Sequence, residues 1–199
     1  MKKHFLLLAI LILISASAAF AQSIEQQVAK IRQITVETNK RIDAGLKDKT
    51  SGLHHATWTL GGARDGQQWG EDVRLVDTAV EYYFDCPPER LEQCWAEDSK
   101  TSLRKAVASY QGLEGLRYKS EYFFAGDTGE LVFAFSTELE ANGKTTERQF
   151  YFNKGKLIRL TQAGKNTDAN FSIKDYLRTE NEASVAKHLS RIFTRIIFE

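Results

Sequence analysis

Two arginines, Arg148 and Arg159, stand beside aromatic residues in the stretch ERQFYFNKGKLIRL, residues 147–160. A guanidinium group binds a carboxylate or phosphate through two parallel hydrogen bonds, and neighbouring rings supply an apolar floor. In the strand pairing predicted below, both arginines lie near one end of a phenylalanine-rich face, close to Tyr118 and Thr137. These four residues are a candidate site for a small anionic ligand.

The same arginines also fit a structural interpretation, the solvated rim of a sheet. Long arginine side chains commonly lay their aliphatic stems over apolar neighbours and keep their charges in water. We favour the rim, and the ligand site is the alternative. Trp58 and Trp69 would belong to the ligand site if their indoles lie in the same exposed cleft.

A second kind of chemistry is suggested by three carboxylates, Asp65, Glu71 and Asp72, which lie near Trp58 and Trp69 in the sequence. Glycosidases use a pair of carboxylates as acid and base, and indoles can stack on sugars. Carboxylates in a polar, turn-rich loop are more often simply solvated. A glycan- or cell-wall-directed hydrolase is therefore the alternative function, and no catalytic residue is assigned.

The sequence lacks the common motifs for metal and nucleotide chemistry. His54 and His55 are adjacent on a predicted strand, so their side chains point to opposite faces. No HExxH, GxSxG or GxxxxGK[ST] motif occurs. We expect neither a metal nor a cofactor. A formal net charge of +1 gives no sign of a nucleic-acid partner.

The first residues, MKKHFLLLAILILISASAAFAQ, have the order of a secretory signal peptide: two lysines, an apolar core and small residues. We predict a signal peptide over residues 1–21, cleaved before Gln22, and one domain over residues 22–199 in the periplasm or outside the cell. The apolar core, residues 6–14, is shorter than the roughly 20 residues that span a bilayer. No transmembrane anchor is expected.

The two cysteines, Cys86 and Cys94, flank both prolines of the chain in the stretch CPPERLEQC. In an oxidising compartment they are expected to form a disulfide bond, which for so short a loop contributes at most roughly 2.5 kcal/mol. A redox or metal site is the competing interpretation. It lacks the CxxC spacing and a histidine nearby in the sequence.

Amphipathic helices are predicted near both ends of the mature chain. Apolar or small residues recur in steps of three and four over residues 24–46, after a candidate N-cap at Ser23. The same pattern recurs over residues 179–198, where Thr179 and Glu182 have the spacing of a capping box. A third, shorter helix is predicted within residues 98–112, as a connection between strands.

Strand patterns occupy the middle of the chain. HHATWTLGG is a short candidate strand, and DVRLVDTAVEYYFD places Val80, Tyr82 and Phe84 on one face. Residues 116–162 contain four further strand patterns separated by GDTG, NG and KG, which are turn signals. The predicted fold class is α+β, an antiparallel β-meander packed against N- and C-terminal helices.

The turns imply a strand register. A two-residue turn at Asn142-Gly143 and another at Lys154-Gly155, with GDTG as a four-residue loop, predict the following opposed pairs: Phe135 with Phe150, Phe133 with Phe152, Phe152 with Leu157, Phe150 with Arg159, Phe124 with Leu131, Tyr122 with Phe133, Tyr118 with Thr137, Thr137 with Arg148, and Arg148 with Thr161. One face of the sheet would then be rich in phenylalanine.

The stretches YKSEYFFAGDTGELVFAF and ERQFYFNKGKLIRL resemble a family of exported bacterial proteins of uncharacterised activity. In that family a GELVF hairpin is followed by an E-R-x-Y-Y-F-x-x-G-K-L-I-R hairpin, and the resemblance covers about residues 70–165. This chain departs from the pattern at Gln149-Phe150. The resemblance implies an exported α+β domain and supplies no catalytic residues.

A well-specified core without a convergent catalytic constellation favours a non-enzymatic binding or interaction module. Its partner would be a small molecule or an envelope protein. An exposed cleft containing the arginines would favour the small molecule, whereas a large exposed apolar patch would favour a purely structural envelope protein.

Overall fold

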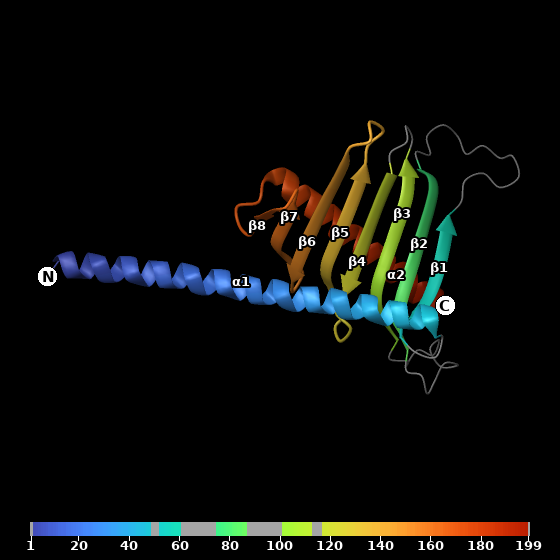
Figure 1. The fold of residues 1–199 in the computed structure, drawn as a ribbon, viewed down its shortest axis with the longest axis horizontal. Coiled ribbons are helices and arrows are strands. Elements are labelled where there is room, and N and C mark those ends of the chain that lie inside the picture. Colours follow the sequence, from blue (N-terminus) through green and yellow to red (C-terminus); the bar gives the residue numbers. More distant parts are fainter. Residues whose placement is uncertain (1, 49–51, 61–74, 87–100, 113–116, 199) are drawn as a thin grey trace, which may run out of the picture.

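The computed structural model describes residues 2–48, 52–60, 75–86, 101–112 and 117–198, of which residues 2–23, 60, 75–78, 111–112 and 196–198 are described by their backbone alone. The elements are α1 (Lys2–Lys47), β1 (His54–Leu60), β2 (Leu75–Asp85), β3 (Ser102–Gly112), β4 (Arg117–Phe124), β5 (Leu131–Leu139), β6 (Thr145–Asn153), β7 (Lys156–Gln162), β8 (Lys165–Thr167) and α2 (Ile173–Phe198). The eight strands form one antiparallel sheet in chain order. The predicted α+β meander between two terminal helices is confirmed (Figure 1).

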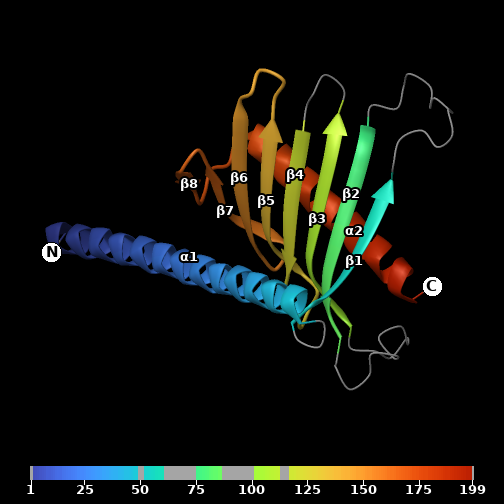
Figure 2. The same ribbon diagram turned by 45° about the vertical axis from the view of Figure 1, so that its right-hand side comes forward.

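The two helices lie on opposite faces of the sheet, as Figure 2 shows. On the α1 face, Ile24, Val28 and Ile31 pack against Tyr151, with Val132, Phe133 and Ile158 around them. Most of the predicted stripe of α1 is buried, but Leu46 at its end is exposed. In the full-length chain Ser23 lies within α1, which is continuous from Lys2 to Lys47, so its predicted N-cap role in the cleaved chain stays a prediction.

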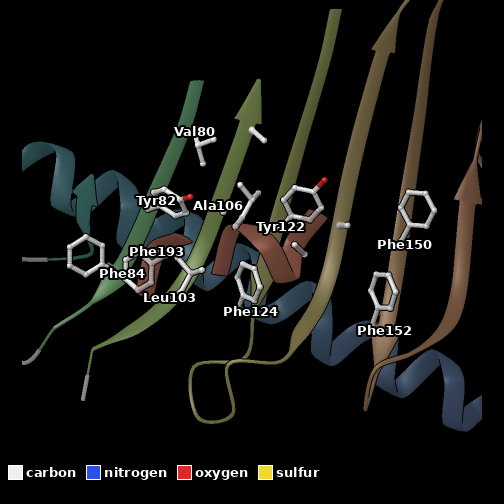
Figure 3. Close-up of a cluster of buried hydrophobic side chains, with 14 of the residues drawn as sticks. Val80, Tyr82, Phe84, Leu103, Ala106, Tyr122, Phe124, Phe150, Phe152 and Phe193 are labelled. Carbon is white, nitrogen blue, oxygen red and sulfur yellow. The ribbon is translucent and has the colours of Figure 1, made fainter. Parts of the chain in front are cut away.

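The larger core lies between α2 and the sheet (Figure 3). Val80, Tyr82 and Phe84 face α2 and are buried, as the alternation in β2 predicts. Leu189 and Phe193 of α2 pack against this surface. The buried aromatic rings contribute most to this core, at roughly 2 to 3 kcal/mol for each fully buried side chain.

The third helix, predicted within residues 98–112, is wrong, because residues 102–112 form strand β3. This strand pairs with β2 on one side and β4 on the other. Backbone pairing on both edges outweighs the moderate helix propensity of the stretch. Ala106 and Ala108 are buried beneath α2, where their small side chains leave room for the helix.

The predicted hairpin at Asn142-Gly143 exists, but its loop is one residue longer than predicted. Glu140 N donates to Lys144 O and Gly143 N donates to Glu140 O, which closes a three-residue loop. Gly143 takes a φ of 81°, and the Asn142 side chain accepts a hydrogen bond from Lys144 N. A type I turn followed by a left-handed glycine is the common three-residue hairpin.

The extra loop residue shifts the β5–β6 register by one. Phe135 lies opposite Gln149 and Phe133 opposite Tyr151, so the predicted pairs of Phe135 with Phe150 and Phe133 with Phe152 are wrong. A one-residue shift moves every side chain of a strand to the other face. Phe133 therefore faces α1, and the predicted phenylalanine-rich face is divided between the two sides of the sheet.

Two further register shifts separate correct pairs from wrong ones. Phe124 lies opposite Leu131 and Phe152 opposite Leu157, as predicted from the turns. The register then shifts by one residue between Phe123 and Phe124 and between Tyr151 and Phe152. Pairs farther from each turn therefore differ by one residue from the prediction. The remaining predicted pairs are corrected as follows: Tyr122 lies opposite Ala134, Phe150 opposite Leu160, Tyr118 opposite Glu138, Thr137 opposite Glu147, and Arg148 opposite Ser136 and Gln162.

Helix α2 begins six residues before the predicted start. Ser172 and Asp175 form its capping box: Asp175 N donates to Ser172 Oγ, and Ser172 N donates to the Asp175 carboxylate. The Thr179 hydroxyl donates to Asp175 O inside the helix. The predicted capping role of Thr179 and Glu182 is therefore wrong, and Glu182 faces the sheet instead.

The predictions about export and the disulfide bond fall largely outside the described side chains. Cys86 is buried at the end of β2, whereas Cys94 lies outside the described residues, so the disulfide bond stays a prediction. The signal peptide and its cleavage before Gln22 also stay predictions. Within the described ranges, no helix combines the length and apolar character that crossing a membrane requires.

Candidate functional site

A cavity of about 320 Å³ lies between the first half of α2 and strands β3 to β6. Eleven of its lining residues carry a polar group and two do not. The lining consists of Tyr110, Tyr118, Ser120, Ser136, Thr137, Glu138, Arg148, Lys174, Arg178, Asn181 and Glu182, together with the apolar Phe150 and Leu177. Most of these side chains therefore combine apolar atoms with a polar group, and the polar groups can fix the orientation of a ligand.

The sheet places the polar residues in two neighbouring rows across its strands. Ser120, Ser136 and Arg148 are directly opposed on β4, β5 and β6, and Tyr118 opposes Glu138 in the next row. Alternate residues along a strand share a face, so both rows lie on the α2 side with Tyr122 and Phe150. The cavity therefore continues the α2-side core beyond its last apolar row.

Arg148 is the central cation of the cavity. It is only 8% exposed, and its Nη1 donates to Glu138 Oε2 at 3.2 Å. Its Nε is buried without a hydrogen-bond partner among the described residues. Glu138 also accepts a long hydrogen bond from the Tyr118 hydroxyl. Buried donors are rarely left without partners, so this guanidinium has unused capacity to bind an oxyanion.

Glu182 enters the cavity from α2. The Tyr122 hydroxyl donates to its Oε2 at 2.7 Å, and Ser120 and Ser136, which oppose each other on β4 and β5, line the same cavity. Burial raises the pKa of Glu182 above its ordinary value, although hydrogen bonds from Tyr122 and Ser136 and the charge of Arg148 oppose the shift. A carboxyl group with a raised pKa exchanges its proton closer to neutral pH than a solvated one.

Two tyrosines form an aromatic wall of the cavity. The rings of Tyr110 and Tyr118 stack across β3 and β4, with centroids 4.8 Å apart and an interplanar angle of 16°. Burial raises the pKa of Tyr110 to about 12, and it also raises that of Tyr118. Both phenols are therefore neutral near pH 7 and can donate hydrogen bonds.

The predicted ligand residues do not form one site. Tyr118, Thr137 and Arg148 line this cavity, whereas Arg159 lies on the α1 face of the sheet. Trp58 on β1 packs against the α2-side core. The other predicted functional residues, Trp69, Asp65, Glu71 and Asp72, lie outside the described residues.

Arg159 has a structural environment. It is 3% exposed and binds two carboxylates, with Nη2 at 2.5 Å from Glu25 Oε1 and at 2.6 Å from Asp168 Oδ2. Hydrogen bonds to Asp168 and Glu25 raise its pKa further. Its charge is thereby neutralised within the protein, so this residue has little left to offer a ligand.

The sequence interpretation missed Glu182, Glu138 and Tyr110. Tyr110 was assigned to the predicted helix, and Glu182 to a helix cap. A signal was present for Glu182: it lies three residues before Val185 and seven before Leu189, on the apolar stripe of the helix. A carboxylate on a buried stripe indicates a polar partner on the facing surface.

A larger cavity, of about 510 Å³, lies on the α1 side and is lined in part by Arg41 and Arg104. Both arginines bind Asp85: Arg41 through two hydrogen bonds at 2.9 and 2.8 Å, and Arg104 through one at 2.9 Å. The hydrogen bond from Arg41 is the main cause that lowers the pKa of Asp85. Arg104 Nε, like Arg148 Nε, is buried without a partner among the described residues. We consider the smaller cavity the stronger candidate because it adds several hydroxyl groups and the stacked rings of Tyr110 and Tyr118 to its buried arginine.

Metal ligation has no support in the part of the chain that the structure describes, which contains no group of three His, Cys, Asp or Glu residues placed to hold an ion. His54 and His55 point to opposite faces, as predicted, and lie against Phe84 and Tyr83 respectively. Comparison with protein-family models, curated proteins and solved structures found no match to this chain.

Proposed function

We propose that this protein is an exported, non-enzymatic binding module that holds a small organic anion in the cavity between α2 and the sheet. The observation that carries the proposal is the buried guanidinium of Arg148, which lines the cavity with its hydrogen-bonding capacity partly unused. Export rests on the signal-peptide pattern and the pair of cysteines.

Charge and size support an anion of modest dimensions. Arg148, Lys174 and Arg178 supply three cations around the cavity, against the carboxyl groups of Glu138 and Glu182. The volume of about 320 Å³ lies at the lower end of the range for small-molecule sites. A ligand about the size of one ring fits this space better than a long chain does.

Native mass spectrometry of the protein purified from its own cells tests the proposal. We expect a stoichiometric small-molecule adduct that is lost in Arg148→Gln and kept in Arg191→Gln, because Arg191 is exposed on α2 outside the cavity. A screen of small carboxylates by ligand-observed NMR covers ligands that are lost on purification. An adduct that survives Arg148→Gln, or the absence of both an adduct and a binding carboxylate, would contradict the proposal.

A glycan-directed hydrolase is the second candidate, now favoured by different residues. Glu138 and Glu182 line one cavity, and burial raises the pKa of Glu182, as a general acid requires. The test is release of new reducing ends from glycans. Activity that is lost in Glu182→Gln and kept in Glu180→Gln would replace the binding module by an enzyme.

A further inference from the structure

We propose that the ligand of the α2-side cavity is an acidic sugar, a hydroxylated ring that carries one carboxylate. The inference rests on the proposed binding function and names its ligand class. It follows from the cavity's combination of strong donors, strong acceptors and flat aromatic surface, which no simple anion uses in full.

The donors and acceptors are interleaved around the cavity. Arg148, Lys174 and Arg178 donate only, whereas the carboxylates of Glu138 and Glu182 accept. The amide of Asn181, on the exposed side of the same lining, can do both. A carboxylate on the ligand satisfies the cations, and its hydroxyl groups can donate to the carboxylates while accepting from Asn181.

The partners of the two carboxyl groups favour hydroxyl donors over a second cation. The Tyr122 hydroxyl already donates to Glu182, and the hydroxyls of Ser120 and Ser136 line the same cavity. Glu138 is paired with Arg148 across the sheet. An ammonium group on a ligand would compete with Arg148 for these carboxylates, whereas a sugar hydroxyl adds to the existing network.

The apolar surface of the cavity comes mostly from side chains that also carry a polar group. Among the lining residues only Phe150 and Leu177 lack a polar group, too few to cover an acyl chain. The stacked rings of Tyr110 and Tyr118 present an apolar body and a polar hydroxyl tip. Such a wall fits the C–H face of a sugar ring with hydroxyls at its edge. A free phosphate has no C–H face to pack against this aromatic wall, and the two carboxylates of the lining would repel it.

Three probes of similar size separate the chemical classes: glucuronate, glucose and cyclohexanecarboxylate. Glucuronate carries hydroxyls and a carboxylate, glucose carries only the hydroxyls, and cyclohexanecarboxylate carries only the carboxylate. We expect isothermal titration of the purified protein to give a Kd for glucuronate that is roughly tenfold or more below those of the other two, because a site that hydrogen-bonds hydroxyls rejects a ligand without them.

The outcomes separate this inference from the proposed function. Cyclohexanecarboxylate binding as tightly as glucuronate would overturn the sugar assignment and leave an anion site. Glucose binding as tightly as glucuronate would overturn the requirement for the acid. Failure of both acids to bind would overturn the sugar assignment and weaken the anion site, which the carboxylate screen then decides.

Two variants locate the binding within the cavity. Asn181→Ala, at an exposed helix position that alanine suits, should weaken glucuronate binding severalfold and leave cyclohexanecarboxylate binding unchanged. Arg148→Lys should weaken the binding of both acids, and Arg191→Lys should weaken neither. Circular dichroism melting establishes that each variant is folded. An Asn181→Ala variant with unaltered glucuronate affinity would overturn the placement of the hydroxyls.

Discussion

Arg148 and Arg159 are both buried in this sheet, but their hydrogen-bond partners differ. Arg159 binds two carboxylates on the α1 face, whereas Arg148 makes one side-chain hydrogen bond to Glu138 on the α2 face and keeps a buried Nε without a described partner. An ion pair that satisfies itself stabilises a fold, and an incompletely satisfied one is a feature of ligand sites. The hydrogen-bond partners, and not the residue type, therefore distinguish the two arginines.

Glu182 gives a prediction about pH. Its pKa is raised in the folded state, so its proton stabilises the fold at low pH, and that stabilisation is lost as the pH rises through the folded-state pKa. Glu182→Gln does not titrate and can still accept from Tyr122. The melting temperature of Glu182→Gln minus that of the wild type should therefore become more positive from pH 4 to pH 8.

The control for this prediction is Glu180→Gln, at an exposed position of the same helix outside the cavity, measured over the same pH range. The variant is compared with the wild type at each pH because other carboxylates also make stability depend on pH. Asp85 and Glu121 have lowered pKa values in the folded state, so the stabilisation from their charged forms is lost as the pH falls. A difference for Glu182→Gln that is flat or falls with pH would contradict the buried environment of this carboxyl group.

Strand β5 shows how one element decides where a site forms. Its three-residue turn places Ser136 and Glu138 on the α2 face, beside Arg148, and Phe133 on the α1 face. With the two-residue turn, Phe133 and Phe135 would have occupied the α2 face instead. The cavity therefore depends on the length of a turn that contributes no residue to it.

That turn can be tested at Gly143. Its φ of 81° is in the left-handed region, and a Cβ added there would meet no atom within 4 Å, so only backbone strain opposes substitution. Gly143→Ala should cost roughly 1 to 2 kcal/mol in the free energy of unfolding measured in urea. Gly143→Asn should cost less, because asparagine tolerates this conformation. Equal losses in the two variants would contradict the left-handed turn.

The seating of α2 on the sheet depends on small residues. Ala106 is fully buried between β3 and α2, where a larger side chain has no space. Ala106→Leu should lower the free energy of unfolding by roughly 1 to 3 kcal/mol through overpacking. Ala169→Leu, at an exposed position before α2, should change it by less than about 0.5 kcal/mol. Similar values for the two variants would argue against close packing of α2 over β3.

Across the whole molecule, one sheet separates two environments. On the α1 side, two ion pairs join α1 to the rest of the molecule, Arg159 with Glu25 and Arg41 with Asp85. A small apolar cluster also lies on this side. The α2 side has the larger apolar core and the polar cavity beside it. The larger apolar core and the proposed ligand site thus share the α2 face, whereas the α1 face carries the ion pairs of Arg159 and Arg41.

Arg159 joins α1, β7 and the segment before α2, because it contacts both Glu25 and Asp168. Arg159→Met should lower the free energy of unfolding by roughly 1 to 2 kcal/mol, less than a fully buried charged pair would give, since Asp168 is partly exposed. Amide hydrogen exchange should become faster over residues 24–31 of α1. Arg191→Met is the control, and protection of α1 equal to that of the control would contradict this role for Arg159.

Local patterns in the sequence were enough to predict the elements that agree with their surroundings: the terminal helices, the alternation that buries Val80, Tyr82 and Phe84, and the Lys154-Gly155 turn. Periodicity and turn chemistry are local properties, and they can be read from neighbouring residues. They also placed Tyr118 and Arg148 among the candidate ligand residues.

The face that each candidate occupies depends instead on how distant strands pair. A longer turn and two register shifts along the strands each change the pairing by one residue, and one residue moves a side chain to the other face. For this reason Arg159 separated from Arg148, and Glu138 joined it. Tyr110 and Glu182 were missed for another reason, because the first was assigned to a helix and the second to a helix cap. Pairing on both edges likewise turned residues 102–112 into a strand, because backbone hydrogen bonds between distant segments outweigh local propensity.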